Sequence, residues 1–245
     1  MTDGIDFFRG RRVLVVGGSS GIGAGIAAAF HRLGAKVTVT GSTAAGVQRA
    51  QADPVLAGVE VMQLDVRSDE EVLACFGALT RLDVLVNCAG VIRRGHELEP
   101  EAFAQVIDIN LNGSMRTCAA ARMLLAASKG CIINTASMLS FFGGGLVPAY
   151  SASKGGVAQL TKSLAIAYAA DGIRVNALAP GWIATPLTAA LQQDANRSNT
   201  ILARTPMGRW GTPDDIAGGA LFLASPWAGF VTGTVLPVDG GYLIT

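Results

Sequence analysis

Short apolar runs alternate with longer, alanine-rich stretches along this chain. The runs, of which "RVLVV" and "DVLVN" are examples, are almost continuously apolar and rich in β-branched residues. Strands buried on both faces of a parallel sheet have this pattern, whereas half-exposed strands alternate apolar and polar positions. We therefore predict parallel strands over residues 12–16, 36–40, 59–64, 83–87, 131–135, 173–178 and 234–238.

The stretches between these runs have the composition of helices. Ser68 or Asp69 can cap one helix, and Thr212 followed by Pro213 can open another. Strands and helices that alternate along a chain predict an α/β fold, in which helices cover both faces of an open sheet and form a three-layer sandwich. The predicted helices are 22–33, 44–51, 69–79, 100–127, 150–170 and 213–224.

The pattern shows no linker, internal repeat or low-complexity tract, so we expect one domain over residues 1–245. Residues 181–211 stand out, because they form a long polar segment between a strand and a helix. Segments of this length in a compact domain usually have a function. We therefore expect residues 181–211 to be a lid over a substrate site.

Composition and charge exclude several classes of protein. Half of the 245 residues are apolar, the formal net charge is +1, and no basic patch for nucleic acid or a membrane surface is evident. The first residues carry acids where a secretory signal needs bases, and no run approaches the ~20 apolar residues of a membrane span. We expect a cytoplasmic protein without nucleic-acid or membrane partners. The four cysteines show no C-x-x-C spacing, so buried thiols are expected rather than a metal site or disulfide.

A glycine-rich turn follows the first predicted strand. In "VLVVGGSSGIG", Gly17, Gly21 and Gly23 leave a backbone that can turn tightly and approach a pyrophosphate, and the next helix points its amides at that position. Such turns are also common without a ligand, but this one joins the first strand to the first helix, as in dinucleotide-binding proteins. Asp65, after the third strand, either accepts a hydrogen bond from the adenine amine or is an ordinary turn acid.

The residues after the second strand bear on the choice of dinucleotide. An acid there holds the ribose 2′-hydroxyl of NAD, and an arginine accommodates the 2′-phosphate of NADP. This chain has Ser42 and Thr43 instead, which can hydrogen-bond to either group. Because the missing acid removes the main barrier to a 2′-phosphate, we favour NADP over NAD.

Tyr150 and Lys154 are four residues apart, so they share one face of a predicted helix. An ammonium beside a phenol favours the phenolate, which would bring the tyrosine pKa down from about 10 and let it act as a general acid or base. The neighbouring residues are serine, alanine and glycine, which leave room for ligands. Many exposed helices carry the same pair without any function, so it gains weight only from its context.

That context resembles the short-chain dehydrogenase/reductase family. The motifs "GGSSGIG", "NCAG", "DINLNG", "NTASM", "YSASK" and "APGWIAT" occur in the order of the family and span nearly the whole chain. The resemblance implies a Rossmann-like domain with a seven-stranded parallel sheet, an NAD(P)(H) cofactor, a small alcohol or carbonyl substrate, and a homotetramer. It also assigns catalytic roles to Asn110, Ser137, Tyr150 and Lys154.

In this resemblance Tyr150 is the acid/base, Lys154 lowers its pKa and binds the nicotinamide ribose, Ser137 orients the substrate oxygen, and Asn110 holds a relay water. Cys88 stands where the family usually has a second asparagine, which weakens the expected support at that strand end. The candidate cofactor-binding residues are Gly17, Ser19, Ser20, Gly21, Ile22, Gly23, Ser42, Asp65, Val66, Asn87, Ala89, Gly90, Tyr150, Lys154, Pro180, Gly181, Ile183 and Thr185.

The stretches "VIRRGHELE", "SMLSFFGGG" and "LQQDANRSNTILARTPMGRWG" resemble the sugar-acid branch of the family, which acts on gluconate and deoxygluconate. Arg94, with Arg93 or Arg197 as a second cation, fits the capture of a carboxylate; the same arginines can equally belong to a solvated loop or a subunit contact. The candidate substrate-binding residues are Arg94, Ser137, Met138 and Tyr150. Two alternatives stay open: an NADPH-dependent ketoreductase of the 3-oxoacyl-carrier-protein type, and a nucleotide-binding scaffold without turnover.

Overall fold

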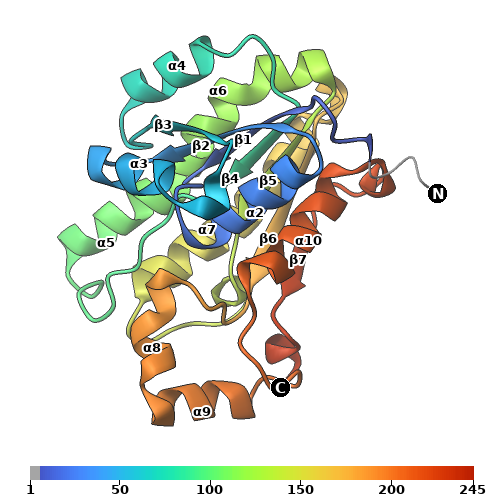
Figure 1. Ribbon diagram of the computed structural model, residues 1–245. Helices are drawn as coiled ribbons and strands as arrows, with labels where there is room; N and C mark the ends of the chain where they lie inside the picture. Colours follow the sequence, from blue (N-terminus) through green and yellow to red (C-terminus); the bar gives the residue numbers. More distant parts are fainter. Residues whose placement is uncertain (1–5) are drawn as a thin grey trace.

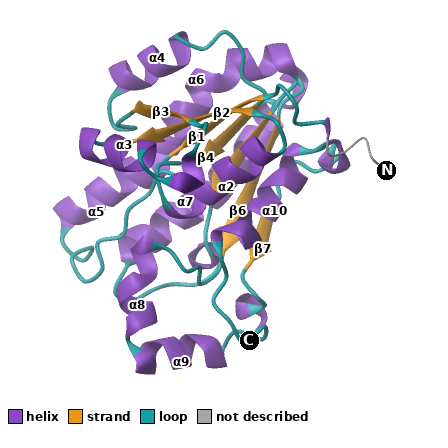
Figure 2. Ribbon diagram, viewed as in Figure 1, coloured by secondary structure: helices purple, strands orange, loops and turns teal. Residues whose placement is uncertain are grey.

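The computed structural model describes residues 6–245 (Figures 1 and 2). Seven parallel strands form one sheet in the order β3-β2-β1-β4-β5-β6-β7, so the strand order reverses direction between β1 and β4. This is the doubly wound order of Rossmann-like proteins. The strands are β1 (Arg12–Val16), β2 (Lys36–Gly41), β3 (Glu60–Gln63), β4 (Val84–Asn87), β5 (Cys131–Thr135), β6 (Arg174–Pro180) and β7 (Val235–Val238).

Helices cover both faces of the sheet, which confirms the predicted α/β class (Figure 2). One apolar core joins the sheet to α2 and α10, and a second joins its other face to α4, α6 and α7. The helices are α2 (Gly21–Arg32), α3 (Ala44–Gln51), α4 (Asp69–Gly77), α5 (Pro100–Ile107), α6 (Gly113–Ser128), α7 (Pro148–Ala167), α8 (Ala189–Gln193), α9 (Ala195–Ala203) and α10 (Pro213–Ala224).

The strands extend to within two residues of their predicted bounds, and α3 and α10 coincide with theirs. The predicted caps are also present: the Ser68 hydroxyl accepts from the backbone of Glu71, and Thr212 caps α10 ahead of Pro213. Side-chain caps satisfy amides that a helix cannot pair internally, which explains why these two starts are fixed locally.

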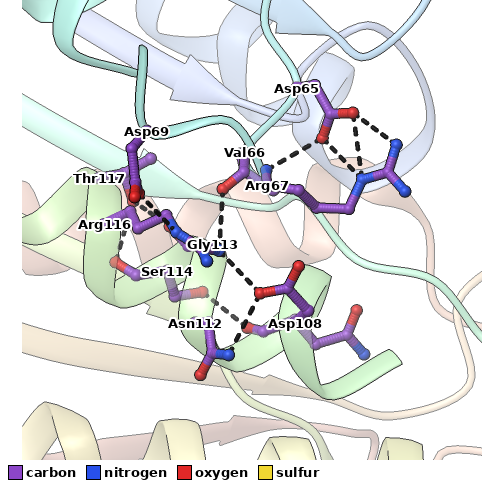
Figure 3. Close-up of polar contacts among 11 residues, drawn as sticks. Asp65, Val66, Arg67, Asp69, Asp108, Asn112, Gly113, Ser114, Arg116 and Thr117 are labelled. Atoms are coloured by element: carbon purple, nitrogen blue, oxygen red, sulfur yellow. Dashed lines mark hydrogen bonds and ion pairs between the residues drawn. The ribbon is translucent and has the colours of Figure 1, made fainter. Parts of the chain in front are cut away.

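The predicted helix over 100–127 is present without a break, but it is not regular throughout. A π-helical turn, Asp108–Asn112, joins α5 to α6. The Asn110 side chain leaves the helix to bind both backbone groups of Val91, and Arg116 holds the turn against α4 by ion pairs to Asp108 and Asp69 at 2.9 and 2.8 Å (Figure 3). These contacts bring together segments far apart in the sequence, so local periodicity cannot reveal them.

Residues 181–211 are not irregular throughout, because they contain α8 and α9. Asp194 separates these helices and caps α9 by accepting from the Arg197 backbone at 3.1 Å. In Figure 1 the two helices lie below the carboxyl ends of the strands, away from the three layers.

All four cysteines are free thiols. Cys75, Cys118 and Cys131 are buried, as predicted, while Cys88 is part-buried.

Within residues 6–245 no group of three or more His, Cys, Asp or Glu is arranged to hold a metal, and no helix there has the length and apolarity to cross a bilayer. Our expectation about a leader rests partly on residues 1–5, which lie outside the described part.

Candidate active site

The candidate site lies at the carboxyl ends of the neighbouring strands β1 and β4, where the strand order reverses. Ligands of doubly wound sheets bind at this reversal of strand order. The β1–α2 turn brings the predicted glycines there, β4 and β5 end beside it, and α7 crosses behind it with Tyr150 and Lys154. Two cavities, of about 160 and 350 Å³, open at this place.

The glycine turn is built for close approach of backbones. Gly17 has φ +78°, and a Cβ on it would lie 2.4 Å from the backbone nitrogen of Ala89. A Cβ on Gly23 would lie 2.5 Å from the carbonyl oxygen of Gly17. Ser20 precedes α2 and makes no side-chain cap, so the first amides of α2 keep their donors for an anion. The residues present therefore fit a pyrophosphate.

The residues predicted to lie near the adenosine half of the cofactor have different environments. A Cβ on Gly41 would lie 3.1 Å from the Ser19 side chain, which places Ser19 against the end of β2, next to the exposed Ser42. The Asp65 carboxylate is already paired with Arg67 at 2.6 Å, and this pairing lowers its pKa (Figure 3). A carboxylate so engaged is less available to an adenine amine, and the turn-acid alternative for Asp65 accounts for the contacts seen. Val66 is buried and contacts Gly113.

At the end of β4 the backbone faces the cleft and the Asn87 side chain does not. Asn87 is buried, donates to Asn134 Oδ1 at 3.0 Å and accepts from Thr117 at 2.8 Å. A contact from Asn87 to a cofactor can therefore come only from its backbone. Cys88 has found a partner in the Thr135 hydroxyl, at 3.3 Å, so the strand end keeps one side-chain bridge to β5.

Gly90 lies between two of the predicted catalytic residues. A Cβ on it would lie 3.4 Å from Asn110 Oδ1 and 3.7 Å from Lys154 Nζ. Asn110 itself is fully buried, and its Nδ2 also donates to Ser153 at 3.1 Å. Asn110 thus links the loop after β4 to α7, beside the lysine.

Ser137 begins a short helical turn after β5. Its hydroxyl accepts from the Leu139 backbone at 3.1 Å, and the Ser140 hydroxyl accepts from the Ser137 backbone while donating to the Lys154 carbonyl at 2.7 Å. These bonds fix the turn against α7, so Ser137 and Tyr150 face each other across the larger cavity, which both residues line.

Tyr150 and Lys154 share a face of α7 as predicted. Lys154 is buried, its Nζ lies 5.5 Å from the centre of the Tyr150 ring, and it donates to the carbonyl of Thr135 at 2.6 Å. Tyr150 and Thr135 line both cavities, so the two spaces meet at the phenol.

The pKa of Tyr150 in the protein alone is raised, whereas the sequence analysis expected it to be lowered. Burial raises the pKa of the phenol to about 12, although the Ser137 hydroxyl lowers it, and the charge of Glu97 raises it further. Burial also lowers the pKa of Lys154 to about 8, so the lysine carries its charge less firmly than usual. The neighbouring ammonium therefore does not bring the pKa of the phenol below its usual value, because desolvation has the largest effect.

The far wall of the cleft comes from the segment after β6. Thr185 lines both cavities, and Pro180, Gly181 and Ile183 line the larger one. A Cβ on Gly181 would lie 2.6 Å from Asp239 Cα, so only glycine fits there. All four predicted residues of this segment therefore lie together along one wall.

The larger cavity continues away from the glycine turn toward two arginines. Arg94 from the loop after β4 and Arg197 from α9 both line it, together with Met138, and none of the acidic residues in 6–245 does. Arg93, the other candidate for the second cation, does not line it. A cavity with two guanidiniums and no carboxylate suits a small anion.

Three residues at this site escaped the sequence analysis. Thr135 stands in a quoted motif but is recognisable only through its contact with Lys154. Trp182 has a buried Nε1 without a hydrogen-bond partner among the described residues, and the centres of the Trp182 and Trp210 rings lie 6.0 Å apart. Glu97 is a buried carboxylate whose partners are backbone amides, for which the sequence holds no signal.

Comparison with known proteins decides the family. The family model described as enoyl-(acyl carrier protein) reductase matches residues 16–243. The chain belongs to the short-chain dehydrogenase/reductase family. This membership confirms the resemblance, and it makes the protein an NAD(P)-dependent oxidoreductase that acts on CH–OH groups. The alternative of a scaffold without turnover is thereby set aside.

Several short-chain dehydrogenases are similar over nearly their whole length. The 2-dehydro-3-deoxy-D-gluconate 5-dehydrogenase of Bacillus subtilis (strain 168) is 43% identical over 242 residues, which cover 96% of this chain and 95% of that protein. The galactitol 2-dehydrogenase (L-tagatose-forming) of Cereibacter sphaeroides is 39% identical over 242 residues, covering 94% of each. The crystal structure of a gluconate 5-dehydrogenase from Burkholderia cenocepacia J2315 in complex with NADP and tartrate has a TM-score of 0.89 and 33% identity, covering 98% of this chain and 99% of that one.

Proposed function

We propose that this chain is a dehydrogenase of a small sugar acid, of the gluconate or deoxygluconate type. The cavity lined by Tyr150, Arg94 and Arg197 is the observation that carries the proposal. In such a space a polyhydroxy acid can place its alcohol carbon beside the phenol and its carboxylate beside a guanidinium. The 2-dehydro-3-deoxy-D-gluconate and gluconate dehydrogenases among the relatives support the same substrate class.

The proposed mechanism uses the four residues gathered around the phenol. When bound, the nicotinamide accepts or donates the hydride. Tyr150 passes the proton to or from the substrate oxygen, and the Ser137 hydroxyl donates a hydrogen bond to that oxygen as charge develops on it. Lys154 binds the ribose next to the nicotinamide, and Asn110 holds the water that relays the proton onward. The ionised form of the phenol would be favoured by the positive charge of an oxidised nicotinamide.

We propose NADP as the preferred cofactor. Neither Ser42 nor Thr43, after β2, is an acid that would repel a 2′-phosphate, and both are exposed there. The NADP-bound gluconate 5-dehydrogenase supports this choice. The proposal also comprises a single catalytic domain with residues 181–211 as its substrate lid, which rests on the sequence pattern. It further comprises a homotetramer, which rests on the family resemblance, and a cytoplasmic location, which rests on composition.

A panel assay tests the substrate class. Gluconate, 2-dehydro-3-deoxygluconate, galactitol and an acetoacetyl thioester are each assayed with NAD(H) and NADP(H) by the absorbance of the reduced nicotinamide, with Tyr150→Phe as the inactive background. We expect turnover of the sugar acids with NADP(H). Preference for the thioester would support the ketoreductase alternative instead.

Arg94→Gln tests how the acid is bound. Because a hydrogen bond to a charged group is worth about 1.5–3 kcal/mol, loss of the guanidinium should raise KM for acids roughly 10- to 100-fold and leave KM for galactitol unchanged. Arg93→Gln is the matched control, since Arg93 lies next in the chain but outside the cavity. Equal KM values for Arg94→Gln and Arg93→Gln on the acid would contradict the assignment.

A further inference from the structure

Glu97 is a buried carboxylate that the proposed mechanism does not use. Only 1% of its surface is exposed. One carboxylate oxygen accepts from the backbone of Arg93 and the other from the backbone of Tyr150, both at 2.8 Å. Among the described residues it has no ion pair. A buried charge is costly unless hydrogen bonds compensate it, so these two amides account for its place in the fold.

The amide of Tyr150 belongs to the first turn of α7, where such groups have no partner within the helix. Val147 precedes the helix and offers no side-chain cap. Glu97 therefore supplies the missing cap from a loop more than fifty residues away in sequence, and its negative charge suits the positive end of the 20-residue helix. The cap sits on the residue that also carries the phenol.

The same carboxylate holds the loop that carries Arg94. Asn110 fastens the start of this loop through both backbone groups of Val91, and Gly95 donates to the carbonyl of Leu146 at 2.9 Å. Glu97 fastens the backbone at Arg93, one residue before the arginine that lines the cavity. One side chain thus joins the backbones of two segments that line the cavity.

We propose that Glu97 is a positioning residue that fixes the distance between Tyr150 and Arg94, and so between the reacting carbon and the carboxylate of the substrate. The part that concerns Arg94 rests on the proposed function, whereas the part that concerns Tyr150 holds for any alcohol the enzyme oxidises. A residue in this role affects substrate binding and proton transfer together, without touching the substrate.

The negative charge of Glu97 affects the pH profile of activity, which a purely structural role of this residue would not. Among the described residues, the charged and titratable groups that face the phenol or line its cavity are Glu97, Lys154, Arg94 and Arg197, with Cys88 beside the lysine. Because the charge of Glu97 raises the pKa of Tyr150, its removal lowers that pKa. The limb of the pH profile in which activity rises with deprotonation of the phenol then moves to lower pH.

The test compares Glu97→Gln, Glu97→Asp and Glu99→Gln. Glutamine keeps the shape but presents an NH2 group to one of the two amides, so one bond is lost along with the charge. Aspartate keeps the charge but is one methylene shorter. Glu99 is exposed and makes no side-chain cap, so Glu99→Gln is the matched control. Circular dichroism and NADP binding establish that each variant is folded.

For Glu97→Gln we expect kcat to fall and KM for the sugar acid to rise, each roughly tenfold as for a lost charged hydrogen bond, with the pH limb moved to lower pH. Glu97→Asp should raise KM while leaving the limb in place, and Glu99→Gln should match the parent. A Glu97→Gln enzyme with unchanged kcat and an unmoved limb would overturn the proposal.

The pH profile is also measured on an uncharged secondary alcohol. If no sugar acid is a substrate, the proposed function fails, yet the limb on the uncharged alcohol still decides the effect of Glu97 on Tyr150. If sugar acids are turned over and KM for them is the same in all three variants, the coupling to Arg94 fails while the proposed function stands.

Discussion

At the scale of single residues, the site combines groups that are unfavourable to the fold. Lys154 is buried without an ion pair among the described residues, where its ammonium donates to the Thr135 carbonyl and lies 5.5 Å from the centre of the Tyr150 ring. Burial lowers its pKa from 10.5 to about 8. Strained or desolvated groups of this kind are typical of functional sites, where activity limits stability.

Lys154→Met should therefore stabilise the fold while abolishing activity. Below pH 8 the folded protein bears the full penalty of the charged lysine. Between about 8 and 10.5 the unfolded chain binds more protons than the folded one, so stability of the parent rises with pH and the advantage of the variant shrinks. We expect a gain of roughly 2 kcal/mol in the free energy of unfolding at neutral pH, measured by urea denaturation.

Lys162→Met is the control for this effect, because Lys162 is an exposed lysine on the same helix. It should change stability little at any pH. A Lys154→Met variant less stable than the parent at neutral pH would show that the Thr135 bond outweighs the desolvation.

Sequence analysis identified the residues that belong to a recognisable motif. It missed the residues whose role depends on tertiary contacts. Tyr150, Lys154, Ser137 and Asn110 were all predicted. The first three line the cleft, and Asn110 is buried beside Gly90 with its side chain bonded to Val91 and Ser153. Glu97 was not predicted, because its partners are backbone amides, one of them in a distant helix. The raised pKa of Tyr150 was also beyond reach, since it depends on how much protein surrounds the phenol.

At the scale of elements, strand positions were predictable because burial on both faces leaves a continuous apolar signature. The π-helical turn at Asp108–Asn112 was not, because it is set by side-chain contacts to Val91 and α4. The opposite end of the sheet shows a similar tie. Asp83 is buried before β4 and accepts from the Arg12 backbone and from the side chains of Arg11 and Arg81 at 2.8–2.9 Å.

Asp83→Asn should weaken the sheet without affecting catalysis. Burial raises the pKa of Asp83, but the hydrogen bonds from Arg81, Arg12 and Arg11 together lower it by more, so the pKa in the folded protein lies below 3.8. The stability that Asp83 contributes is therefore fully present above the unfolded pKa of 3.8 and is lost as the pH falls through the folded pKa. We expect a loss of about 2 kcal/mol at neutral pH and a smaller dependence of stability on acid, measured by urea titrations.

The control is Asp214→Asn, which removes an ion pair to Arg32 with both side chains more than half exposed. Exposed pairs contribute about 0–1 kcal/mol, so little change is expected. Because Asp83 lies at the amino ends of the strands, kcat of Asp83→Asn should equal that of the parent. A reduced kcat in a fully folded Asp83→Asn sample would contradict this separation of stability from activity.

At the scale of the whole molecule, the sheet holds the glycine turn and the acid/base in place, and the segment after β6 completes the cavity. The two ends of this segment are joined: Gly211 donates to the Trp182 carbonyl at 2.9 Å, and Ala184 donates to the Gly211 carbonyl at 2.8 Å. Between these joined ends, α8 and α9 bring Leu191 and Arg197 to the cavity. A segment whose two ends are hydrogen-bonded to each other can move as one unit while the sheet stays fixed.

Hydrogen–deuterium exchange tests the proposed lid. Cofactor and sugar acid together should slow exchange of the amides in α8 and α9 several-fold, because Arg197 gains an anionic partner that holds the segment closed. Cofactor alone should slow the β1–α2 turn but leave α9 nearly unchanged. The amides of α4, which lines neither cavity, are the internal control. Equal exchange of α9 with and without the acid, in a sample whose β1–α2 turn is protected, would mean that residues 181–211 form a fixed wall rather than a lid.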